Sequence, residues 1–208
     1  MLSQRKNESY NGYSIMELVV VIAIVGIATA FAIPQIAASR RLTRSVAVTR
    51  ELMTQMRYAR QLAMSNREAY TFSYDNAAKT IRIIDNNAVG TAPLTDGNYP
   101  QNAGSNVIAT IPINGMAASE LVYGIPSGFP TAALGDGVSQ TALTSNRFNV
   151  TFQPDGSVIN AAGNPTSAGM FIYNNTVPAA TASAISILGA TGRIKIWRYA
   201  SSVNQYAD

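Results

Sequence analysis

A long uncharged run near the start of the chain restricts its fold more than any other feature of the sequence. Residues 18–33 carry no charged side chain, and Thr29 is their only hydroxyl. As a helix this run would span roughly 24 Å at about 1.5 Å per residue. The flanking segments 13–16 and 36–38 extend it toward the roughly 30 Å of a bilayer core. We therefore expect a transmembrane helix over residues 13–38.

An acidic side chain stands at the head of this run. Glu17 directly precedes Leu18, and an unpaired carboxylate in apolar surroundings costs several kcal/mol unless it finds a partner. If the chain were cut after Gly12, the new amino group at Tyr13 would lie one helical turn from Glu17. In a stack of such helices, Glu17 of one subunit can pair with the terminal amine of another. Only the correct axial register avoids burying both charges unpaired.

These residues resemble the N-terminus of type IV prepilins and type II secretion pseudopilins. In that family a short basic leader ends in glycine, and a peptidase cuts after it and methylates the new terminus. A glutamate is then the fifth residue of the mature chain. Gly12, Tyr13 and Glu17 match these positions, with Tyr13 replacing the usual phenylalanine. Pro34 stands where many members have a helix-kinking proline. The resemblance implies a leader at 1–12, processing at Gly12 and Tyr13, and assembly roles for Glu17 and Pro34.

The resemblance also implies a location and partners. Members of the family span the bacterial inner membrane once, with the head in the periplasm, and assemble into a pilus or pseudopilus. The expected partners are therefore the prepilin peptidase/methylase, other pilins or pseudopilins, and the inner membrane. Arginines lie on both sides of the apolar run, so their distribution does not fix the orientation.

A conventional secretory signal peptide is the alternative for the same residues. Arg5 and Lys6 would form its basic region, residues 18–33 its apolar region, and Ala30-Phe31-Ala32 its cleavage site. The product would be a secreted soluble β-domain. Glu17 fits this alternative poorly, because an acid at the head of the apolar region is unfavourable for a signal peptide.

The composition disfavours the common kinds of enzyme. The 208-residue chain has no histidine and no cysteine, which removes the commonest general base, the thiol nucleophile and the main metal ligands. The aspartates of the head stand beside asparagine or glycine, as is typical of turns. We expect a non-enzymatic protein with no catalytic residue, metal or cofactor. The net charge of +4 is only mildly basic.

A second helical pattern follows Pro34. No proline or glycine occurs from Gln35 to Asn66, and apolar residues recur at steps of mostly three and four. We predict one long helix that continues from the anchor as an amphipathic stem over residues 39–66. The predicted apolar stripe comprises Leu42, Val46, Met53, Met56, Ala59, Leu62 and Ala63.

After Asn66 the sequence pattern changes to the alternation of β-strands. We predict hairpins over 70–84, over 148–159 with a turn at Asp155-Gly156, and over 184–199. Further strands are predicted at 107–113, 121–123 and 170–173, with long loops at 85–106 and 126–146. The predicted fold is α+β: a long N-terminal helix, comprising anchor and stem, packed on a β-rich antiparallel head over residues 67–208.

Three segments narrow the resemblance to the minor pseudopilin branch typified by secretion protein H and the fimbrial proteins T and U. They are residues 57–63, the turn 152–156 and the terminal 192–196. This resemblance implies a structural subunit that primes or tips a type IV pilus or a type II secretion pseudopilus. The sequence does not separate these two roles.

One basic cluster suggests a further binding function. Arg193, Lys195 and Trp197 share one face if residues 193–199 form a strand, and Arg198 is adjacent. Two cations and an aromatic ring can contact phosphates and stack a base, as in a DNA-uptake pseudopilin. The alternative is an edge strand protected by its charges, with Trp197 packed on the stem.

Overall fold

The computed structural model describes residues 13–86, 106–160 and 164–207, and the chain forms two compact units that meet at Arg40/Arg41. Helix α1 (Ile15–Asn66) runs through both units and continues through Pro34 without interruption. The predicted leader, including Gly12, lies outside the described residues. The predicted stem, from Arg41 onward, belongs to the same unit as the predicted head.

The first unit consists of the N-terminal part of α1. Every side chain described between Tyr13 and Arg40 is exposed to solvent, including the whole apolar run. By length and composition α1 can cross a membrane. A surface of this kind requires an apolar environment outside the chain.

In the second unit α1 is amphipathic, as predicted, and the predicted stripe agrees with the buried one in its second half, where Met53 and Leu62 are partly buried against the core. The buried side chains follow steps of three and four, which place them on one face. Met56, Ala59 and Ala63 belong to this face as predicted, whereas Leu42 is exposed. The full buried stripe is Ser45, Val48, Thr49, Leu52, Met56, Ala59 and Ala63. In the first half of this stripe the prediction omitted Val48 and Leu52 and did not count Ser45 and Thr49 as core.

The first sheet has four antiparallel strands in the order β3-β2-β1-β5. These are β1 (Tyr70–Asp75), β2 (Thr80–Asp85), β3 (Asn106–Pro112) and β5 (Arg147–Phe152). The predicted first hairpin is confirmed, with Tyr74 opposite Ile81. Most of the predicted loop 85–106 lies outside the described residues.

The second sheet has five antiparallel strands in the order β4-β6-β7-β8-β9. These are β4 (Leu121–Tyr123), β6 (Ala168–Asn174), β7 (Ser183–Ile187), β8 (Ile194–Ala200) and β9 (Gln205–Ala207). A single turn of helix, α2 (Pro178–Thr181), connects β6 to β7. The β7–β8 hairpin was predicted, whereas α2 and β9 were not.

The predicted hairpin over 148–159 is confirmed only next to its turn, where the Gln153 N–H donates to the Ser157 carbonyl. The main partner of β5 is β1, and residues 157–159 form only isolated bridges, with Val158 opposite Phe152. The Val158 N–H donates instead to the Gly189 carbonyl at 2.7 Å. The turn itself was predicted correctly, since Gly156 has a φ of +80°. The chain therefore leaves β5 through the expected turn and then crosses to the second sheet.

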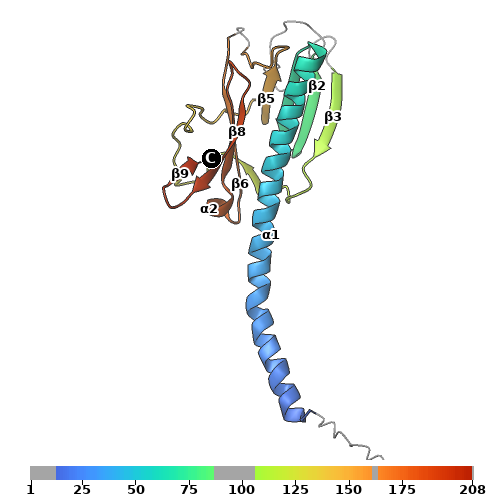
Figure 1. Cartoon of the computed structure of the whole chain (residues 1–208), viewed down its shortest axis with the longest axis vertical. Helices are drawn as coiled ribbons and strands as arrows, with labels where there is room; N and C mark the ends of the chain where they lie inside the picture. The colour runs from blue at the N-terminus through green and yellow to red at the C-terminus, as the bar shows by residue number, and fades with distance from the viewer. Residues whose placement is uncertain (1–12, 87–105, 161–163, 208) are drawn as a thin grey trace, which may run out of the picture. The chain divides into compact units, whose positions relative to one another are not determined.

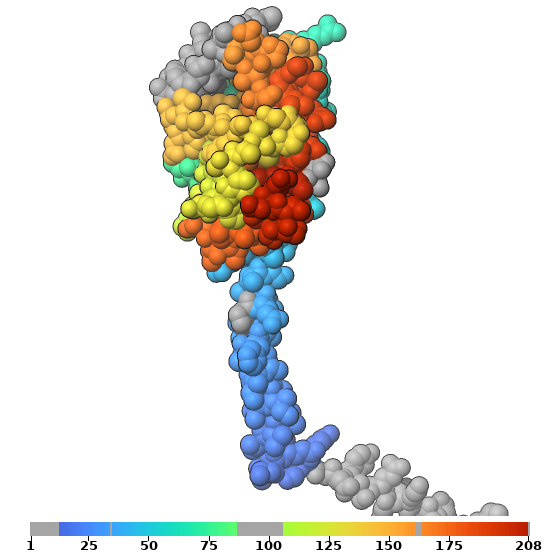
Figure 2. Space-filling model, turned by 90° about the vertical axis from the view of Figure 1, so that its left-hand side faces the viewer, coloured from blue at the N-terminus to red at the C-terminus, as the bar shows by residue number. Residues whose placement is uncertain are grey.

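Two apolar clusters hold this unit together. The larger lies between α1 and the inner faces of both sheets, where Leu52 and Met56 meet Phe72, Phe148 and others; Figure 1 shows α1 along the sheets. The smaller lies on the other face of the second sheet and comprises Leu134, Val138, Phe171, Ala184 and Trp197. The loop 126–146 covers it, and Figure 2 shows this loop in yellow beside the red C-terminal strands. Both faces of β6 and β7 are therefore buried.

Candidate functional site

The first turn of α1 presents a carboxylate at the head of an exposed apolar surface. Ser14 begins the helix: its Oγ accepts from the Met16 N–H at 3.3 Å, and its carbonyl accepts from the Glu17 and Leu18 N–H groups. Glu17 follows in the first turn, where the helix dipole favours an acidic group. Tyr13, the predicted new N-terminus, is 85% exposed.

Glu17 is available to an external partner. Among the residues that the structure describes it has no ion-pair partner, and its apolar neighbours Leu18 to Val21 are at least half exposed. A carboxylate on such a surface can act as a specific contact between helices, because pairing removes the penalty of burying it.

The three segments that carried the second resemblance meet at one point. Arg60 of the stem donates from Nε to the Gly156 carbonyl at 3.2 Å and from an Nη to the Thr191 carbonyl at 2.9 Å. The first carbonyl belongs to the turn after β5 and the second to the turn between β7 and β8. One side chain of α1 thus ties a turn of each sheet to the helix. We call Arg60, Gly156, Thr191 and Gly192 the clamp.

Two features of the clamp favour glycine at positions 156 and 192. Gly156 and Gly192 have φ values of +80° and +60°, which disfavour residues with a β-carbon. In addition, a β-carbon on Gly192 would come within 1.8 Å of the Gly156 carbonyl oxygen. The two turns therefore touch backbone to backbone.

The structure separates the predicted DNA-binding residues onto two sides of β8. Lys195 and Trp197 share one side, as predicted, with the Lys195 Nζ 3.9 Å from the centre of the indole ring. Arg198 points the other way, toward the stem, and Arg193 stands exposed just before the strand. Because Trp197 is only 6% exposed, its ring cannot stack a nucleic-acid base.

The alternative interpretation of this strand is wrong only in where it places Trp197. β9 pairs only with the last three residues of β8, Arg198 to Ala200, so among the described residues Ile194 to Trp197 pair with β7 alone. Trp197 packs beneath the loop 126–146 rather than on the stem: its ring contacts the Gly135 position, and its Nε1 donates to the Ser186 Oγ at 2.8 Å. The Ser186 Oγ in turn donates to Asp136 at 2.5 Å. Alternation along a strand shows which residues share a face of the sheet, but it does not show which part of the protein packs against that face.

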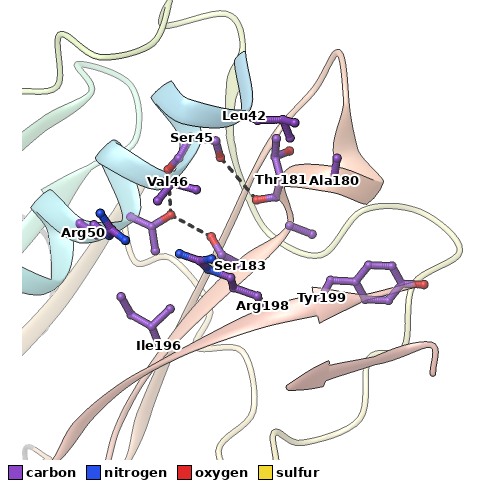
Figure 3. A pocket seen from close by; sticks show the side chains of 12 residues that line it. Leu42, Ser45, Val46, Arg50, Ala180, Thr181, Ser183, Ile196, Arg198 and Tyr199 are labelled. Atoms are coloured by element: carbon purple, nitrogen blue, oxygen red, sulfur yellow. Dashed lines mark hydrogen bonds between the residues drawn. The ribbon is translucent and has the colours of Figure 1, made fainter. Parts of the chain in front are cut away.

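Between the stem and the second sheet lies a small pocket that the sequence did not reveal. Its volume is about 90 Å³, and its walls come from α1, the α2–β7 segment and β8. Figure 3 shows Arg50 reaching from α1 and Arg198 from β8, near the contact between α1 and Ser183. Both arginines are exposed, and no acidic residue lines the pocket. We call this the arginine pocket.

Buried hydroxyl groups form the floor of the arginine pocket. Thr49 Oγ1 donates to the Ser45 carbonyl at 3.0 Å, so the Ser183 Oγ, 2.9 Å away, is left to donate to Thr49. Ser45 Oγ donates to the Thr181 carbonyl at 3.4 Å, and Thr181 Oγ1 donates to the Val177 carbonyl. All four hydroxyl protons are thus used within the protein.

One ion pair fixes the end of the first sheet. Arg147 Nε donates to an Asp75 oxygen at 3.1 Å, and the N–H groups of Ala77 and Ala78 donate to the other oxygen at 2.9 Å. Burial tends to raise the pKa of Asp75, but the Ala78 N–H, Arg147 and the Ala77 N–H outweigh it and hold the pKa below its usual value.

Burial raises the pKa of Tyr206, in the last strand, to about 12. Within the described residues, no group of three or more acidic side chains could hold a metal ion.

Comparison with known proteins yields two solved structures. No protein-family profile matches the chain, and no curated protein sequence does. Two crystal structures of the Pseudomonas aeruginosa type IV minor pilin FimU resemble it. One has 21% identity and a TM-score of 0.43 over 72% of this chain and 85% of that one. The other has 19% identity and a TM-score of 0.42, over 72% and 90% respectively. These values are too low to establish family membership.

Proposed function

We propose that this chain is a minor pilin: a membrane-anchored, non-enzymatic subunit that primes or tips a filament. The observation that carries the proposal is the N-terminal part of α1, whose described apolar side chains are all exposed and which bears one carboxylate in its first turn. A bilayer would accept the apolar side chains, but it would leave Glu17 unpaired at a cost of several kcal/mol. A neighbouring subunit with a free N-terminal amine would satisfy both requirements.

The finer parts of the proposal come from the sequence. Gly12 and Tyr13 define the cleavage position, after which a prepilin peptidase/methylase modifies Tyr13. The anchor spans the inner membrane with the head in the periplasm, and Pro34 lets the helix bend within the filament. The filament is a type IV pilus or a secretion pseudopilus. The clamp supports the narrower resemblance to secretion protein H and fimbrial proteins T and U, since it gives all three segments of that resemblance one structural role.

The N-terminal residue of the mature protein tests this proposal against the signal-peptide alternative. We expect mass spectrometry to find mature protein beginning at a methylated Tyr13. Gly12→Val should leave an unprocessed form about 1.4 kDa heavier, because a β-carbon crowds the peptidase site. Gly26→Ala is the control, since nothing lies within 4 Å of a β-carbon there. Mature protein that begins at Ile33 would show the pilin proposal to be wrong.

A substitution at Glu17 tests assembly separately from insertion. Glu17→Val should leave insertion intact or improved, because it removes a charge from the apolar run. It should nevertheless reduce incorporation into sheared filaments. Thr29→Val is a matched control, because the Thr29 hydroxyl bonds only to carbonyls of its own helix. Normal amounts of the Glu17→Val protein in filaments would contradict the pairing.

A further inference from the structure

We infer that the arginine pocket receives the carboxylate of an aspartate or glutamate side chain from a neighbouring subunit. This inference rests on the proposed function for the identity of the partner, but not for the chemistry of the pocket. It begins from charge: Arg50 and Arg198 line the same pocket, and within the described ranges neither has a hydrogen bond or an ion pair. Two guanidinium groups with no acid between them repel each other, and a bound anion would remove this repulsion.

The hydrogen-bond donors that remain free in the pocket favour a carboxylate over other anions. Ser45, Thr49, Thr181 and Ser183 have all committed their hydroxyl protons to partners within the protein. Tyr199 donates its hydroxyl proton to the Asn204 Oδ1 at 2.8 Å. The side-chain donors left facing the pocket are the two guanidinium forks, which match the two oxygens of a carboxylate. A phosphate, with more oxygens to satisfy, would usually recruit hydroxyl or backbone donors as well.

The size of the pocket indicates that the carboxylate belongs to a protein. At about 90 Å³ it is much smaller than the roughly 300–1,000 Å³ of pockets that enclose whole small molecules. It has room for one ionic group, so the rest of the ligand must lie outside. Leu42, Val46 and Ala180 provide apolar surface around the pocket that suits the methylene groups of an acidic side chain reaching in.

Because Arg50 and Arg198 are exposed, the pocket binds a carboxylate strongly only when another subunit covers it. The two arginines are exposed, so a free carboxylate in water would bind them weakly. A neighbouring subunit that covers the pocket would exclude water and strengthen the same contacts. The ion pair in the pocket thus forms only on assembly. It makes the contact between the heads of neighbouring subunits specific, which the Glu17 pairing does not do.

Arginine side-chain NMR on the full chain in neutral detergent micelles tests the chemistry. Sodium acetate and inorganic phosphate serve as probes at constant ionic strength, and Arg50→Gln and Arg198→Gln assign the two Nε–H signals. Acetate should shift both signals saturably and leave Arg57, on the exposed side of the stem, unmoved. Arg198→Gln should weaken the acetate response of Arg50 by about tenfold or more. The absence of a saturable shift, or tighter binding of phosphate than of acetate, would overturn the inference.

Photo-cross-linking in cells that assemble filaments tests the partner. With p-benzoylphenylalanine at the exposed Ala180, we expect a cross-link to a peptide of another subunit that contains an acidic residue. Arg50→Gln with Arg198→Gln should reduce its yield, whereas Arg57→Gln should not. A cross-link to lipid, or none in filaments that contain the protein, would refute the inference and leave the proposed function intact. If acetate binds but the protein never enters filaments, both the proposed function and the choice of a neighbouring subunit as partner are wrong. The binding of a carboxylate by the arginine pocket would still hold.

Discussion

At the residue scale, Gly192 has the least room of any position in the clamp. Gly192→Ala would place a β-carbon against the Gly156 carbonyl and force a residue with a β-carbon into a φ of +60°. We expect a loss of about 3 kcal/mol or more in the free energy of unfolding, measured by thermal or chemical denaturation. Gly128→Ala is the matched control, because its φ is +84° but nothing lies within 4 Å. It should lose only about 1–2 kcal/mol. Equal losses would mean that the two turns do not touch.

Asp75 gives the stability of the head a pH dependence of predictable sign. Its pKa is lower in the folded state than its ordinary value of 3.8, so its contribution is present above that value. The contribution disappears as the pH falls through the folded-state pKa. Asp75→Asn should therefore destabilise the protein at neutral pH by about 1.5–3 kcal/mol, and by progressively less at acidic pH. Urea denaturation at a series of pH values measures this difference, and a constant difference would contradict the assignment.

At the scale of elements, Arg60 links α1 to both sheets through hydrogen bonds to two turns. Arg60→Ala should lower the free energy of unfolding by about 1.5–3 kcal/mol, because both carbonyls lose a charged donor. Arg57→Ala changes the same residue type on the exposed side of the same helix and should have little effect. Equal stabilities of the two variants would show that the clamp is not a stabilising contact.

The sequence predicted most elements because the period of its apolar residues changes at Asn66. The first and third hairpins could be recognised from alternating residues around short turns. β9 was missed because three residues, Gln205 to Ala207, are too short to show a period. Residues 157–159 were assigned wholly to a hairpin with β5 because the sequence does not show that the Val158 N–H bonds to Gly189, far along the chain. The arginine pocket could not be predicted, since Arg50 and Arg198 are brought together only by the packing of α1 on β8.

At the scale of the whole molecule, DNA binding remains a prediction that now depends on phosphate contacts alone. Arg193 is exposed and Lys195 partly so, whereas Trp197 is buried. The full chain in neutral micelles should bind duplex DNA in the micromolar range or more weakly, and binding should fade as salt rises. Arg193→Ala with Lys195→Ala should weaken it, and Arg50→Gln should not. Unchanged binding by the double variant, measured by fluorescence anisotropy, would contradict this role.

The position of Trp197 makes its fluorescence an intrinsic probe of the loop 126–146. It is the only tryptophan in the chain, and it sits in the smaller apolar cluster, beneath the loop 126–146. Its emission will therefore follow the release of that loop, whereas the far-ultraviolet circular dichroism signal is dominated by α1. If the two signals change at the same denaturant concentration, both faces of the second sheet unfold as one cooperative unit. If emission changes first, the loop opens while the helix is still folded, and the two events can be followed separately without adding a label.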